Sequence, residues 1–120
     1  LEGAFLGASD YIQALRARAA LNQQIRANFA QVDAFATPTM PRPPETFAAL
    51  DPEEANRRPN FTNPFNLTGL PAISVPCGFT PSGLPVGMQI AGRPFDEATV
   101  LRIAHSYEQA TTWHEQRPTL

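Results

Sequence analysis

Apolar residues in the first part of the chain recur at the spacing of an α-helix. Between positions 9 and 32 they fall at 12, 15, 19, 25, 29 and 32, which places them on one side of a helix. Ser9 is suited to cap the first turn, and Asp10 lies where the positive end of the helix dipole favours an acidic side chain. We therefore predict one long amphipathic helix over residues 9–32.

Three short apolar runs predict strands. The run "DAFATPT", residues 33–39, is typical of a buried strand that ends at Pro38, because proline has no N–H to donate to a neighbouring strand. The runs "AISVPCGF" (72–79) and "PVGMQIAG" (85–92) are apolar enough to be buried strands. The intervening "TPSG" predicts a turn, with proline at its second position and glycine at its fourth.

A second amphipathic helix is predicted over residues 96–113, with Asp96 as its cap. One face of this helix should lie against the sheet, because apolar or small side chains recur along it at Val100, Ala104, Tyr107 and Thr111.

Seven of the thirteen prolines lie in residues 38–64, so this segment is expected to be extended and stiff. Within it, residues 51–58 predict a helical turn capped by Asp51. The segment is either a linker between domains or a stiff loop laid across a larger protein. Apolar side chains interspersed in it favour the loop: Phe47, Leu50 and Phe61.

Composition narrows the classes of function. The 120 residues suffice for one domain or part of one, and the net charge of −2 gives no reason to expect nucleic acid as a partner. The chain has no run of eighteen apolar residues, so no membrane span is expected. The single cysteine excludes an internal disulfide and fits a reducing compartment, so we expect a cytoplasmic protein. The first ten residues lack the pattern of a signal peptide and are typical of a chain entered midway.

Few side chains have the pattern of a catalyst or a metal ligand. All nine basic residues are arginine, so no lysine amine can act as a base within the chain. Cys77 lies in an apolar strand with no neighbouring positive charge in sequence, as a small hydrophobic residue would. Ser82 lacks the flanking glycines of a nucleophile elbow, and His105 and His114 have no Cys, Asp or Glu at metal-ligand spacing. We predict no catalytic residue, no metal site and no cofactor in these 120 residues.

Spaced glycines, prolines and polar residues in the second half of the chain carry a family resemblance. Residues 61–111 resemble the C-terminal part of the amidase signature enzymes, and the last predicted helix follows "RPFDE", as in that family. The upstream "ASDYIQALRARAAL" and "DAFATPTMP" are similar to the helix and strand that precede this part. The motifs are N-x-x-G-x-P-A at Asn66, Gly69, Pro71 and Ala72; V-P-x-G at Val75, Pro76 and Gly78; and G-L-P-x-G-x-Q at Gly83, Leu84, Pro85, Gly87 and Gln89.

The resemblance implies hydrolysis or transfer at a carboxamide by a serine nucleophile, a bridging serine in a cis peptide and a lysine base. In the family these groups lie in a Gly/Ser-rich region toward the N-terminal half, and the absence of lysine here agrees with their lying outside this chain. Residues 1–120 are then the C-terminal part of one amidase domain, inactive alone. The implied fold is of the α/β class: a partial mixed β-sheet flanked by two long helices, as the C-terminal portion of the amidase signature fold.

Residues 60–68 are predicted to line the substrate pocket, because they combine apolar walls with a few polar groups, as small-molecule sites do. For Phe61, packing in the core is an equally good interpretation. Asn66 is expected to bond backbone groups at the Gly69 turn rather than a ligand. The predicted substrate-binding residues are Phe61, Thr62, Phe65, Asn66 and Thr68.

Three residues of the motifs are expected to shape the scaffold. Gly69 should turn the chain after a short helix that ends near Thr68. Gly87 should allow neighbouring groups to approach closely, and Gln89, among apolar neighbours, should satisfy buried backbone groups.

The expected partners are a small amide and the N-terminal part of the same amidase, with no nucleic acid or membrane; a homo-oligomer stays open. The A subunits of tRNA-dependent amidotransferases are similar too, but they usually carry an aspartate two residues before the "F-T" pair to hold the amino group of glutamine. Here that place is Pro59, which cannot form this ion pair, so a general amidase is favoured over a glutamyl-tRNA(Gln) amidotransferase-like transamidase. Fatty-amide, carbamate and urea-derivative hydrolases stay open.

A stand-alone, non-catalytic binding module is a further alternative from a different class. The run "PTMPRPP" is typical of segments that dock in aromatic grooves. A Gly/Ser-rich signature encoded upstream would favour the amidase, whereas a start codon there would favour the module.

Overall fold

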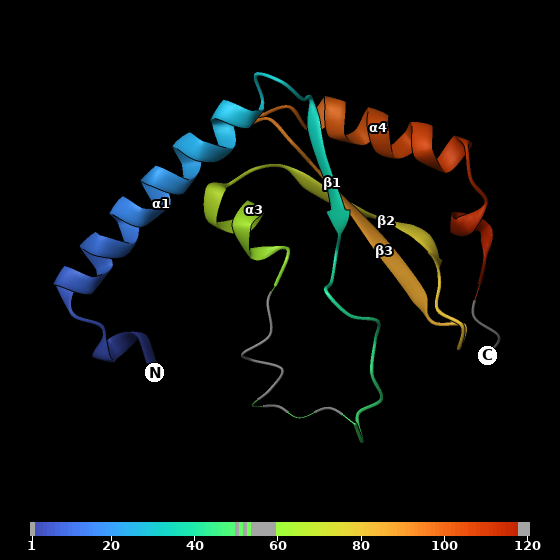
Figure 1. The fold of residues 1–120 in the computed structure, drawn as a ribbon, viewed down its shortest axis with the longest axis horizontal. Coiled ribbons are helices and arrows are strands. Elements are labelled where there is room, and N and C mark those ends of the chain that lie inside the picture. Colours follow the sequence, from blue (N-terminus) through green and yellow to red (C-terminus); the bar gives the residue numbers. More distant parts are fainter. Residues whose placement is uncertain (1, 50, 52, 54–59, 118–120) are drawn as a thin grey trace.

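The computed structural model describes residues 2–49, 51, 53 and 60–117. In this part of the chain, two long helices, three strands and three short helical segments are arranged around a small sheet (Figure 1). The elements are η1 (Glu2–Phe5), α1 (Ala8–Asn28), β1 (Ala34–Pro38), α3 (Asn63–Thr68), β2 (Ala72–Phe79), β3 (Pro85–Gly92), α4 (Glu97–Gln109) and η2 (Trp113–Glu115).

The sheet has the strand order β1-β3-β2, with β3 in the centre and both pairings antiparallel. Its strands begin and end at the predicted residues in β2 and β3 and within one residue in β1. The predicted "TPSG" turn is closed by a hydrogen bond of 2.9 Å from the N–H of Gly83 to the C=O of Thr80. The α/β class is confirmed, and a parallel pairing of the expected mixed sheet would involve strands outside this chain.

The core lies between the sheet and α4. Val100 and Ala104 of α4 pack on Val75 and Ile90, and each of these four residues is 3% exposed or less. Asp96 caps the helix as predicted, because its carboxylate accepts a hydrogen bond of 3.3 Å from the backbone N–H of residue 99. The apolar face of α4 thus packs on one face of the sheet, as the spacing of its apolar residues predicted.

The predicted extension of the second helix to residue 113 is wrong, since α4 ends at Gln109. Just after the helix, the Thr111 hydroxyl donates to the C=O of Tyr107 at 3.0 Å. The chain then forms η2, where the ring of Trp113 packs on Phe79 of β2 with a centroid separation of 6.2 Å.

The predicted first helix forms, but its ends differ from the expectation. It begins at Ala8, after Gly7 rather than Ser9 as N-cap, and no side chain bonds its first turn. It ends at Asn28 instead of residue 32. Most of its apolar side is also exposed in the described structure, since α1 has no buried residue and Ile12 is 49% exposed. In Figure 1 this helix extends away from the sheet.

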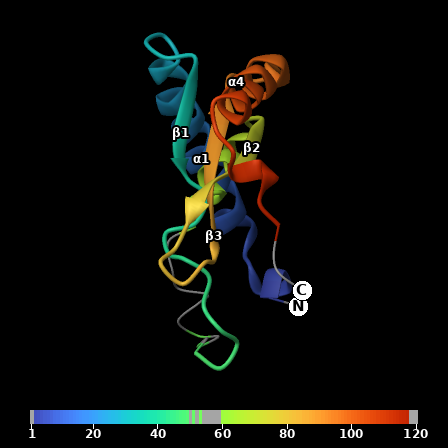
Figure 2. The ribbon, with the colours of Figure 1, turned by 90° about the vertical axis from the view of Figure 1, so that its right-hand side faces the viewer.

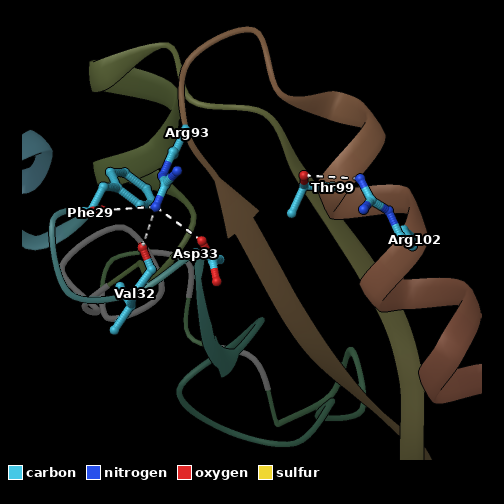
Figure 3. Close-up of polar contacts among 6 residues, drawn as sticks. All are labelled: Phe29, Val32, Asp33, Arg93, Thr99 and Arg102. Atoms are coloured by element: carbon cyan, nitrogen blue, oxygen red, sulfur yellow. Dashed lines mark hydrogen bonds and ion pairs between the residues drawn. The ribbon is translucent and has the colours of Figure 1, made fainter.

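One arginine accounts for the early end of α1. The Nη2 atom of Arg93, just after β3, donates to the C=O of Phe29 at 3.0 Å and to the C=O of Val32 at 3.3 Å (Figure 3). The same atom lies 3.0 Å from a carboxylate oxygen of Asp33. Because a cation at the C-terminus of a helix satisfies terminal carbonyls, Arg93 holds the chain in the turn that leads into β1. Phe29 closes this junction by packing edge-on against Phe35, with ring centroids 4.9 Å apart.

The proline-rich segment leaves the sheet directly after β1. The N–H of Thr39 still donates to the C=O of Gly87 at 2.9 Å, and the chain then runs away from the sheet (Figure 1). Phe47 is 98% exposed, so it is not packed against the described residues. Leu50 and Pro59 lie outside the described residues, and so does most of the helical turn predicted over residues 51–58. Within that turn, the Asp51 carboxylate accepts a hydrogen bond from the N–H of Glu53 at 2.9 Å. The choice between loop and linker stays a prediction.

The chain as a whole is flat and open. Its principal extents are 51 × 42 × 19 Å, and Figure 2, turned by 90° from Figure 1, shows the narrow profile. The radius of gyration is 17.5 Å, whereas a compact domain of this length would have about 14 Å. Much of the apolar surface of α1 and of the segment after β1 is therefore exposed.

Candidate functional site

The segment predicted to line the pocket is a short helix with defined ends. Before α3, the side-chain oxygen of Asn60 accepts from the N–H of Thr62 at 2.9 Å and from its hydroxyl at 2.5 Å. After α3, Gly69 adopts φ 69° and ψ 32°, and the N–H of Leu70 donates to the C=O of Phe65 at 3.1 Å. Only glycine enters this left-handed conformation without steric cost, so the predicted Gly69 turn is confirmed.

A buried amide attaches the start of this segment to the sheet. The side chain of Gln89, in the central strand, is 4% exposed. Its Nε2 atom donates to the C=O of Phe61 at 3.1 Å and to the hydroxyl of Thr37 at 3.2 Å. Neighbouring strand residues point to opposite faces, so this amide lies on the face opposite Ile90 and α4. Gln89 thus satisfies a backbone carbonyl, as expected, in a bond that is partly buried.

The five predicted site residues lie together, in and just before α3, but differ in accessibility. Phe61 is 37% exposed and Asn66 is also exposed. Phe65 is half-buried, with its ring centroid 6.5 Å from that of Phe35. Thr68 is 8% exposed and donates its hydroxyl to the C=O of Pro64 at 2.7 Å.

Two side-chain hydroxyls in this group bond within the segment itself. That of Thr68 closes on its own helix, and that of Thr62 bonds Asn60. The expected bond from Asn66 to the Gly69 turn does not form among the described residues, because the backbone bond to Phe65 already closes this turn. Phe61 and Asn66 are thus the side chains of the five with the most accessible surface.

A row of polar side chains crosses the same face of the sheet. Thr37 and Ser74 flank Gln89 by strand register, and the Ser74 hydroxyl also lies 2.6 Å from that of Thr39. Gly87 leaves room for this pair, since a Cβ there would lie 2.8 Å from the Ser74 Oγ and 3.0 Å from the Thr39 Oγ1. The expected close approach at Gly87 is confirmed.

Sequence reasoning missed the three hydroxyl residues of this row, Thr37, Thr39 and Ser74. The available signal was their alternation with apolar residues along β1 and β2, which places them on one face of the sheet.

An open hollow of about 310 Å³ lies on the sheet beside this row. Its lining is largely apolar and includes none of the five predicted site residues. Cys77, predicted as a buried thiol, is half-buried in the lining of this hollow, because the register shift between Pro76 and Gly78 interrupts the alternation of β2. The lining residues are Ala36, Thr37, Pro38, Cys77, Val86, Gly87 and Met88.

The remaining ionisable side chains do not form a site in the described part of the chain. No three His, Cys, Asp or Glu residues are grouped there in a way that could hold a metal ion. His105 is exposed on α4, and the Nδ1 atom of His114 is buried without a hydrogen-bond partner among the described residues. No helix of this part combines the length and the apolar character needed to cross a bilayer.

Comparison with known proteins identifies the family. Residues 2–101 match the model of the amidase family. The A subunit of glutamyl-tRNA(Gln) amidotransferase from Thermodesulfovibrio yellowstonii is 44% identical over 112 residues, which are 92% of this chain and 23% of that protein. The corresponding protein of Geobacillus thermodenitrificans is 45% identical, with the same shares covered.

Solved structures agree with this assignment. The crystal structure of the A subunit of glutamyl-tRNA(Gln) amidotransferase from Thermotoga maritima superposes with a TM-score of 0.79 at 38% identity, covering 86% of this chain and 23% of that one. A substrate complex of 6-aminohexanoate cyclic dimer hydrolase gives a TM-score of 0.79 at 25% identity, covering 97% and 27%. The chain spans about a quarter of the length of these relatives. With the family model matched over most of its length, the chain belongs to the amidase signature family.

Proposed function

We propose that the chain is the C-terminal part of an enzyme that hydrolyses carboxamide C–N bonds, in which it supplies three strands and one wall of the amide pocket. Membership of the amidase family supports the reaction class. The quarter of a relative's length that the chain spans supports its being part of a larger enzyme.

The observation that carries the pocket assignment is the attachment of residues 61–68 to the sheet. Sites on rigid elements hold a ligand more accurately than sites on loose loops. Here the backbone at Phe61 is bonded to the central strand through Gln89, while Phe61 and Asn66 keep accessible surface. An aromatic wall beside an amide group is the mixture expected of a site for a small amide. In this proposal Thr62, Phe65 and Thr68 maintain the shape of the wall.

The reacting groups belong elsewhere in the protein. The chain contains no lysine, so the Ser–cis-Ser–Lys triad implied by the family lies outside it and the chain alone is inactive. Its partner is then the N-terminal part of the same enzyme. Exposed apolar side chains support such a partner, since Phe5 of η1 is 89% exposed and Tyr11 of α1 is 64% exposed. We expect the enzyme in the cytoplasm, and a homo-oligomer stays open.

Glutamine-dependent transamidation is the second candidate. It is favoured by the 44% identity to the amidotransferase protein of Thermodesulfovibrio yellowstonii. Pro59 opposes it, because it stands where the family resemblance places the aspartate that holds the amino group of glutamine. A general amide is therefore the first choice of substrate.

Release of ammonia tests the proposal. The protein that contains this chain together with its upstream region is purified and given benzamide, propionamide or glutamine, beside residues 1–120 alone. We expect ammonia from benzamide and propionamide with the larger protein and only background with residues 1–120. Release of ammonia from glutamine but from neither of the other two amides would favour the second candidate. Release from no amide, or full activity of residues 1–120, would contradict the proposal.

A further inference from the structure

Gln89 is the buried polar side chain that joins three separate parts of the chain. It lies in the central strand β3, 4% exposed, and one nitrogen atom bonds both Thr37 of β1 and the backbone of Phe61. The residues it connects are 52 and 28 positions away in sequence. Hydrogen bonds shielded from water are stronger than exposed ones, and an unpaired buried amide is costly.

The segment that follows Phe61 needs an external attachment. α3 has six residues, fewer than two turns, and helices of that length are not stable alone. Its other polar attachment among the described residues is the exposed bond from Arg18 Nε to the C=O of Leu67, 2.5 Å long, at its far end. At its near end, the bond from Gln89 to Phe61 sets where the backbone enters the segment.

We propose that Gln89 is a positioning residue for substrate selectivity: by fixing the backbone at Phe61 it sets the distance of the Phe61 ring from the acyl group of the amide. Gln89 itself does not touch the substrate. This inference rests on the proposed function, in which residues 61–68 form the pocket wall. The substituent it discriminates is an aryl against a small alkyl group on the amide carbonyl, because a displaced wall changes the space beside a bulky group most.

Two substitutions in the intact protein separate the two bonds of Gln89. Gln89→Met keeps the length of the side chain but removes both bonds. Thr37→Val is the matched control, because it removes only the bond to β1 and leaves the bond to Phe61. Gln89→Asn, shorter by one methylene, repeats the test if the methionine variant does not fold.

Two readouts are taken on each variant. Backbone amide hydrogen exchange over residues 61–70 reports whether the segment is held, with residues 85–92 as the internal reference. Separate kcat and KM values for benzamide and propionamide report selectivity. For Gln89→Met we expect faster exchange in 61–70 and a KM for benzamide raised about five- to tenfold, because the displaced Phe61 ring loses contact with the aryl group. Its KM for propionamide and both kcat values should change less than about twofold, and Thr37→Val should resemble the unmodified protein.

The outcomes distinguish this inference from the proposed function. Faster exchange with altered selectivity in Gln89→Met alone supports the inference. Unchanged exchange, equal effects of Thr37→Val, or faster exchange with unchanged selectivity overturns it. If Gln89→Met loosens residues 61–70 but the unmodified protein hydrolyses no amide, the proposed function fails while the attachment of the segment by Gln89 stands.

Discussion

Replacement of Gly87 by alanine tests the close packing on the polar face of the sheet. Gly87 lies in the central strand, between the side chains of Thr39 and Ser74 from the two outer strands. An added Cβ would lie 2.8 Å from the Ser74 Oγ and 3.0 Å from the Thr39 Oγ1, closer than such atoms normally approach. Ser74 can rotate away only by giving up its hydrogen bond of 2.6 Å to Thr39.

The expected change in the free energy of unfolding combines two destabilising contributions and one stabilising contribution. Overpacking of an ordered site costs about 1–3 kcal/mol, and loss of the hydroxyl pair costs about 0.5–1.5 kcal/mol. The smaller conformational entropy of alanine in the unfolded chain returns about 0.4–1 kcal/mol. Gly87→Ala should therefore lower the free energy of unfolding by about 1–3 kcal/mol. In an intact protein about four times as long as this chain, as its relatives are, this corresponds to a fall in Tm of roughly 1–3 °C.

Thermal unfolding of the intact protein measures this change, with Gly3→Ala as the matched control because no atom lies within 4 Å of a Cβ at Gly3. Removing the hydroxyl in the double variant Gly87→Ala/Ser74→Ala should relieve part of the clash, so the two substitutions should not be additive. A Tm for Gly87→Ala equal to that of the unmodified protein would refute the reasoning. The same shift in both Ser74 backgrounds would also refute it.

Three further predictions concern other contacts. Arg93→Ala should lower the free energy of unfolding by about 1–2 kcal/mol, because three acceptors lose their donor. The control Arg102→Ala loses one exposed bond to Thr99 and should leave Tm nearly unchanged. Equal shifts in Tm for the two variants would contradict the role of Arg93 at the end of α1. Phe61→Ala should alter the ratio of rates on benzamide and propionamide more than it lowers Tm; a loss of about 3–5 kcal/mol with unchanged ratio would make Phe61 a core residue. Cys77 is half-buried and its thiol donates to the C=O of Val86 at 3.5 Å, so it should react more slowly with a thiol reagent in the native protein than in denaturant; equal rates would show that this partial burial does not protect it.

The strands were predictable because local chemistry defines their ends. Pro85 and Gly92 bound the apolar run that became β3, and the "TPSG" turn before it has few alternative conformations. Asp96 marked the start of α4 in the same way. The spacing of Val100 and Ala104 then identified the face that packs on the sheet.

The rest depends on contacts between distant residues. The end of α1 is determined by Arg93, more than 60 positions later, which no local pattern near Val32 reveals. Among the described residues α1 contacts mainly α3, so its periodicity predicted a buried face of which most stays exposed. For the site, composition indicated the segment 61–68, but its attachment depends on the register that places Thr37 opposite Gln89.

A structure of the intact protein with a bound amide tests the central claim most directly. If this chain forms a wall of the amide pocket, benzamide should lie within about 4 Å of the Phe61 side chain, with the reactive serine contributed from outside residues 1–120. Benzamide bound away from residues 61–68, with Phe61 packed instead into the protein core, would contradict the claim.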